Sequence, residues 1–113
     1  MIKNHSEEVK KLINQYKKKI VFGKDIDFLI KRIKVSKEEI EKEILECKNL
    51  VLAEKQIKDG ETRYALFFTY SKRKGRKYVV TFRDKNIRII TIFLLGRKTL
   101  KRYKKKGLNT RSN

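Results

Sequence analysis

The fold is decided by the stretch LVLAEKQIKDGETRYALFFTYSKRKGRKYVVTFRDKNIRIITIFLL, residues 50–95. Apolar side chains recur there at every second position, which is typical of strands with one buried face. Polar segments divide the stretch: Asp59-Gly60 is a favoured two-residue hairpin sequence, residues 71–76 form a basic loop, and residues 84–86 form a turn. We therefore expect four antiparallel strands in meander order. The expected strands are Leu50–Ile57, Thr62–Tyr70, Lys77–Arg83 and Ile87–Leu95.

Three helices are expected before this sheet. In the first, apolar residues recur at helical spacing between residues 9 and 20. The second covers residues 26–33, with Asp25 as its expected N-cap. In the third, Ser36 and Glu39 have the spacing of a capping box. The sequence thus predicts an α+β fold, with about three N-terminal helices packed on a four-stranded antiparallel sheet (a meander), followed by a basic C-terminal segment.

The segment after Gly96 is almost wholly basic. Leu100 and Tyr103 are its main apolar residues, so we expect a short helix at the sheet edge that adds little apolar surface. A chain of 113 residues has the size of one domain. We assign that single α+β domain to residues 1–107, and expect residues 108–113 to be a disordered tail.

Charge is distributed unevenly along the chain. The net charge is +19, from 32 Lys and Arg against 13 Asp and Glu. Residues 62–113 hold 17 basic residues and a single acid, Asp84, whereas residues 1–61 are nearly balanced. Several glutamates crowd the expected third helix, which we therefore expect to face away from nucleic acid. This asymmetry predicts a basic surface in the C-terminal half that binds a polyanion, with RNA as the leading candidate.

The residue inventory argues against several catalytic classes. Cys47 and His5 are the single cysteine and the single histidine, so neither a disulfide nor a Cys/His metal cluster is expected. The sequence has no P-loop and no glycine-rich dinucleotide fingerprint, so no cofactor is expected. It also contains no apolar run of the length that a membrane span needs and no signal peptide. We expect a cytoplasmic protein without metal, cofactor or membrane contact.

Any catalysis must then use arginine, lysine and tyrosine, and these residues can cleave RNA. In that reaction the 2′-hydroxyl attacks the adjacent phosphorus, and negative charge builds on the phosphoryl oxygens. Positioned arginine and lysine donors stabilise this charge, and a tyrosine or lysine can move the proton if nearby cations lower its pKa. The same side chains also bind phosphate without cutting it, so composition leaves both functions open.

Two blocks of the sequence resemble the RelE/ParE toxin superfamily. They are GRKYVVTFRD, residues 75–84, and IRIITIFLLGR, residues 87–97, followed by Tyr103. Residues 28–52 are in addition similar to the BrnT-like small ribonuclease toxins. The resemblance implies helices first, then an antiparallel meander, then a basic C-terminal segment. It also implies an endoribonuclease toxin of a toxin–antitoxin system that needs no metal.

The resemblance assigns catalytic roles to three residues. Lys77 opens the third strand, where the family more often has arginine, and would hold the phosphate. Arg97 follows the last strand and would stabilise the transferring phosphate, and Tyr103, six residues later, would act in proton transfer. The family's paired lysines on the preceding strand have no counterpart in register, because Phe68 and Tyr70 stand there.

The leading prediction is a metal-independent endoribonuclease toxin that acts on RNA and is neutralised by an acidic antitoxin protein. Whether the RNA is free or ribosome-bound mRNA stays open at this point. Two alternatives stay open: a non-catalytic basic nucleic-acid-binding protein that uses the same surface, and a ParE-like toxin directed at DNA gyrase. The expected RNA-binding residues are Arg63, Lys72, Arg73, Lys74, Arg76, Arg83, Lys98, Lys101 and Arg102.

Overall fold

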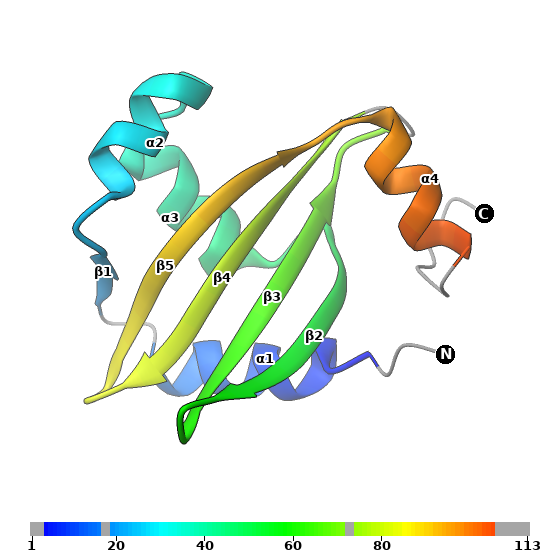
Figure 1. The fold of residues 1–113 in the computed structure, drawn as a ribbon. Coiled ribbons are helices and arrows are strands. Elements are labelled where there is room, and N and C mark those ends of the chain that lie inside the picture. Colours follow the sequence, from blue (N-terminus) through cyan, green and yellow to red (C-terminus); the bar gives the residue numbers. More distant parts are fainter. Residues whose placement is uncertain (1–3, 17–18, 72–73, 106–113) are drawn as a thin grey trace.

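A computed structural model describes residues 4–16, 19–71 and 74–105 of the chain (Figure 1). Four helices and five strands occur in this part of the chain. In chain order they are α1 (Ser6–Tyr16), β1 (Ile20–Phe22), α2 (Ile26–Ile33), α3 (Lys37–Glu46), β2 (Leu50–Lys58), β3 (Glu61–Thr69), β4 (Gly75–Arg83), β5 (Asn86–Leu95) and α4 (Arg97–Lys105).

The sheet has the order β1-β5-β4-β3-β2 and is mixed. Strands β2 to β5 pair antiparallel with their neighbours in the chain, which confirms the predicted meander. The prediction of a purely antiparallel sheet of four strands was wrong, because a fifth strand, β1, pairs parallel with residues 87–89 of β5. The described chain has four helices: α1 to α3 precede the meander, and α4 follows it, where a short basic helix was expected. The first helix ends at Tyr16 rather than reaching Ile20. Ile20-Val21-Phe22 combines two β-branched residues with an aromatic one, which favours an extended strand over a last helical turn.

Local signals in the sequence explain several element boundaries. Asp59 and Gly60 both have positive φ, 52° and 77°, as a type I′ hairpin turn requires. The capping box is confirmed, since Ser36 Oγ accepts a hydrogen bond from the Glu39 amide at 3.1 Å. Asp25 occupies the N-cap position of α2, but its side chain makes no capping hydrogen bond.

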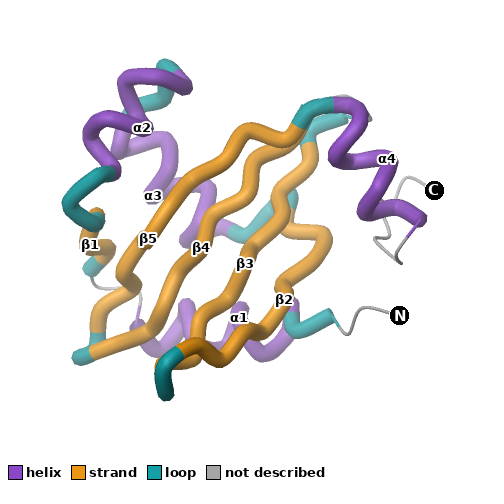
Figure 2. The backbone as a smooth tube through the Cα atoms, in the orientation of Figure 1, coloured by secondary structure: helices purple, strands orange, loops and turns teal. Residues whose placement is uncertain are grey.

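The main hydrophobic core lies between one face of the sheet and helices α1, α2 and α3 (Figures 1 and 2). Alternate residues of the strands supply the sheet side of this core, as the period of two predicts. The strand residues buried in it include Ala53, Tyr64, Leu66, Phe68, Tyr78, Val80, Ile87, Ile89 and Ile92.

A second, smaller core lies on the opposite face of the sheet, where α4 covers one end. Leu100 of α4 is 4 % exposed and packs with Phe67 and Leu95. The expectation that this segment adds little apolar surface was therefore wrong, because one leucine at the right helical position closes the cluster. Gly75 lies beneath α4: a Cβ there would stand 2.8 Å from the Phe68 carbonyl oxygen and 3.3 Å from Leu100 Cδ2, so only glycine fits without a shift.

Candidate nucleic-acid interface

Beyond α4, this second face of the sheet carries no helix of the described chain, and we call it the open face (Figure 1). Directly paired residues of antiparallel strands point to the same side, so the strand register arranges the open face in rows. Extended to the strand ends, the register gives these rows, starting from the α4 end: Leu52–Phe67–Lys77–Phe93, Glu54–Ala65–Val79–Thr91, Gln56–Arg63–Thr81–Arg88 and Lys58–Glu61–Arg83–Asn86.

Lys77 lies between two aromatic rings in the first row. Its ammonium nitrogen is 4.7 Å from the centroid of Phe93 and 5.6 Å from that of Phe67. Phe67 is fully buried, whereas Phe93 is 47 % exposed. A cation over an aromatic face is attracted by the ring quadrupole, so the two rings hold the Lys77 ammonium at the border between α4 and the rest of the open face.

Arginines dominate the other end of the open face. Arg63 Nε lies 2.7 Å from a Glu61 carboxylate oxygen, and Arg83 Nη1 lies 3.7 Å from the other oxygen of the same carboxylate. Arg83 remains 64 % exposed, and Arg88 is exposed in the row beside Thr81. Five cations thus stand against two acids in these rows. The cations are Lys58, Arg63, Lys77, Arg83 and Arg88, and the acids are Glu54 and Glu61.

Helix α4 extends the positive charge at the Lys77 end. Arg97, Lys98 and Lys101 are exposed on it, and Lys74 is exposed in the loop that enters β4 at the same end. Arg102 and Tyr103 lie within α4, but only their backbone is described, so nothing follows about their side chains. Lys72 and Arg73 lie outside the described residues.

Arg76 is separated from the other expected RNA-binding residues because it points to the helix side of the sheet. Its guanidinium lies 3.1 Å from the Glu43 carboxylate and 3.5 Å from that of Glu39, and its side chain is 12 % exposed. The hydroxyls of Tyr70 and Tyr78 also donate to Glu43. Burial and these bonds to a carboxylate raise the pKa of both tyrosines far above the usual value of 10, so neither can act as a proton acceptor near neutral pH.

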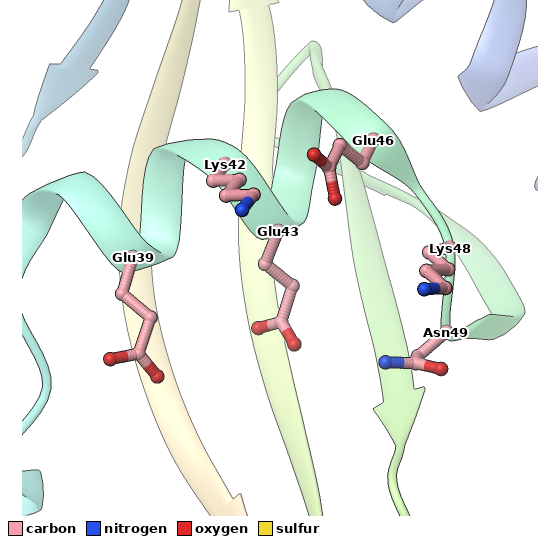
Figure 3. Close-up of a pocket in the computed structure, with 6 residues that line it drawn as sticks. All are labelled: Glu39, Lys42, Glu43, Glu46, Lys48 and Asn49. Atoms are coloured by element: carbon pink, nitrogen blue, oxygen red, sulfur yellow. The ribbon is translucent and has the colours of Figure 1, made fainter.

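A shallow pocket of about 170 Å³ lies beside this cluster, on α3 (Figure 3). None of the predicted site residues contributes to it. Its lining mixes three carboxylates with two lysines and an amide: Glu39, Lys42, Glu43, Glu46, Lys48 and Asn49.

The structure therefore divides the predicted set into groups. Lys74, Lys77 and the described cations of α4 gather at one end of the open face, and Arg63 and Arg83 lie at the other end. Sequence reasoning missed Arg88 and Phe93, which share the open face with them. Arg88 carried a signal in β5, because it is a charged residue between the two core residues Ile87 and Ile89. Phe93 carried none, because it stands in an apolar run.

Comparison with known protein families, with curated proteins and with solved structures finds no significant match. Within the described ranges, no group of three or more His, Cys, Asp or Glu side chains could hold a metal ion. No helix in the same part of the chain is long and apolar enough to cross a membrane.

Proposed function

We propose that this protein binds RNA along the open face and the adjoining surface of α4. The observation that carries the proposal is the excess of cations on a sheet face that α4 covers at only one end. Most of the glutamates of α1 and α3 lie on the opposite side of the sheet. A polyanion approaching the open face therefore meets positive charge from β2 to β5 and onward along α4.

A more specific form of this proposal is that the protein also cleaves RNA. The placement of two residues, Lys77 and Arg97, favours it. Lys77 and Arg97 come from different elements yet lie at the same end of the sheet, because Lys77 pairs with Phe93 and α4 begins two residues after Leu95. Lys77 would hold the phosphate and Arg97 would stabilise the charge that develops on it. Tyr103 would move the proton, as the resemblance to RelE-like toxins implies.

The order of the elements also supports this form of the proposal. Apart from the short parallel strand β1, helices come first, then an antiparallel meander, then a basic C-terminal helix, which is the arrangement that the resemblance implies. An acidic antitoxin protein would be the natural counterpart of such a basic surface, because it would cover the charges that RNA needs.

Binding is tested by salt titration. The affinity for a single-stranded RNA should fall steeply with salt, because each neutralised phosphate contributes about −0.7 to the slope of log K against log[salt]. Replacing Arg63, Lys77 or Arg88 by Met should remove about one phosphate contact. Each replacement should therefore reduce the magnitude of the slope by about 0.7. Lys24→Met and Lys31→Met are the matched controls, since both lysines are exposed on or next to α2, on the other side of the sheet. A flat titration of the parent protein would contradict the proposal.

Cleavage is tested separately, with labelled RNA incubated with the protein in EDTA, with and without translating ribosomes. Products that end in a 2′,3′-cyclic phosphate would support attack by the 2′-hydroxyl. Tight binding without any product under either condition would assign the protein to the non-catalytic class. Inhibition of DNA supercoiling by gyrase in place of RNA cleavage would assign it to the gyrase-directed class.

A further inference from the structure

Phe93 is about half exposed on the open face and belongs to neither hydrophobic core. The described part of the chain exposes six large apolar side chains, and Phe93 is the one that lies in the rows of the open face. Leu94 and Ile57 belong to the opposite register, because they pair with Arg76 and Thr62. An exposed ring on an otherwise polar, cationic surface marks a contact site rather than part of the core.

The surroundings of Phe93 combine its own ring, a nearby cation and a row of short side chains, which we call the low strip. The Lys77 ammonium lies 4.7 Å from its ring centroid and leaves nearly half of the side chain exposed. The next row consists of Thr91, Val79 and Ala65 beside Glu54, and none of the first three projects far from the sheet. Arg88 stands one row beyond, because the bulge in the β4–β5 register between Val79 and Val80 keeps it on the open face although it is five residues from Phe93. Two rows span about 14 Å along the sheet, since alternate residues of a strand are about 7 Å apart.

We propose that Phe93 is a base-stacking residue and that the open face takes single-stranded RNA, with one base on the Phe93 ring and its flanking phosphate at the Lys77 ammonium. The strand would run along β5 over the low strip toward Arg88. This inference rests on the proposed RNA binding and names the form of RNA that the face accepts.

The preference for a single strand follows from what each form of RNA offers. In a duplex both faces of nearly every base are already stacked, so an exposed aromatic ring gains nothing from it. In a single strand the base faces are free, and a ring beside a cation binds base and phosphate together. The ring also tolerates any base, because every base has a π face.

The test uses three variants of the full chain. Phe93→Leu removes the ring and keeps an apolar side chain, and Phe93→Tyr keeps the ring. Phe28→Leu is the matched control, because Phe28 is 66 % exposed on α2 and also has a cation beside it, with the guanidinium carbon of Arg32 6.0 Å from its centroid. The probes are a single-stranded RNA of about 12 nucleotides, the same sequence as DNA, and a blunt RNA duplex of the same length, which has no single-stranded loop.

Phe93→Leu should weaken binding of the single-stranded RNA about tenfold and leave binding of the duplex within about twofold. It should also leave the salt slope unchanged, because stacking releases no counterions. Phe93→Tyr and Phe28→Leu should bind like the parent, and all three should keep the parent's thermal midpoint.

Three results would overturn the inference while leaving RNA binding in place. The first is that Phe93→Leu binds the single strand with the parental affinity. The second is that Phe93→Leu loses as much affinity for the duplex as for the single strand, and the third is that Phe28→Leu loses affinity as well. Equal affinity for the DNA strand would overturn the choice of RNA and keep the stacking. If the parent protein shows no salt-dependent RNA binding at all, the proposed function itself fails.

Discussion

The Glu43 carboxylate and the Arg76 guanidinium lie 3.1 Å apart, and each of the two side chains is only 12 % exposed. The pair joins α3 to β4 on the helix side of the sheet. Tyr70 and Tyr78 add their hydroxyls to the same carboxylate. One acidic side chain therefore satisfies three donors from the sheet, which fixes α3 on the main core.

Glu43→Ala should lower the free energy of unfolding by about 3 kcal/mol, because it leaves a nearly buried guanidinium and two tyrosine hydroxyls without their acceptor. Urea unfolding followed by circular dichroism measures the change. Glu46→Ala, at an exposed position of the same helix, should stay within about 0.5 kcal/mol of the parent. Equal stability of the two variants would show that the Glu43 cluster does not hold α3.

Stability should depend on pH through Glu8. Its carboxylate accepts hydrogen bonds from the Tyr64 hydroxyl at 2.5 Å and the Lys55 ammonium at 3.0 Å, and His5 Nδ1 lies at 3.1 Å. These contacts lower the pKa of Glu8 from 4.5 to about 2. A folded-state pKa below the unfolded value means that the stabilisation is complete above pH 4.5 and is lost as the pH falls toward 2.

The measurement compares the parent protein with Glu8→Gln in urea at pH 7 and at pH 3. The parent should be the more stable at pH 7, and the difference should shrink at pH 3. Glu7→Gln is the control, since Glu7 is 86 % exposed, and its difference from the parent should change little. A Glu8→Gln difference that is the same at both pH values would contradict the prediction.

Leu100→Ala should cost about 2–4 kcal/mol, because it opens a cavity over Phe67 and Leu95 in the second core. The variant keeps every charge of α4, so it separates the packing role of the helix from its electrostatic role. Lys98→Ala removes an exposed charge instead. It should leave the melting temperature unchanged and weaken RNA binding slightly, and the opposite pattern would show that α4 is not anchored by Leu100.

Arg97→Ala and Tyr103→Phe should reduce RNA cleavage about a hundredfold or more while changing RNA affinity by less than about tenfold. The reason is that transition-state contacts affect the chemical step rather than ground-state binding. Single-turnover cleavage at saturating protein measures the chemical step, and filter binding measures the affinity. If both variants cut RNA at the parental rate, the catalytic assignment of these residues is wrong.

Local patterns predicted most of the fold. The alternation in residues 50–95 and the two-residue turn at Asp59-Gly60 define β2 to β5, and the Ser36 capping box defines the start of α3. Strand β1 escaped prediction because three extended residues carry too little periodicity to be separated from the preceding helix. The residues of β5 with which it pairs are also remote in the sequence, so no local pattern predicts the pairing.

The site was harder to predict because charge content does not tell which face a residue occupies. Arg76 and Lys77 are neighbours in a basic run, yet the period of two sends them to opposite sides of the sheet. Phe93 was hidden in an apolar run in which core and open-face residues alternate without a change of hydrophobicity. Only the register with Lys77 separates it from Ile92 and Leu94.

Strand β1 has a consequence for the order of folding. Ile20 pairs with Ile87, 67 positions later in the chain, whereas β2 to β5 are joined by loops of two to five residues. Closing the longer loop costs more chain entropy, so we expect the meander to assemble first and β1 to dock afterwards. Until it docks, residues 87–89 at the outer edge of β5 lack their pairing strand, and another copy of the chain can pair with them. Chains of charge +19 repel one another. We therefore expect the charge that we propose for polyanion binding to oppose self-association of the half-folded sheet as well.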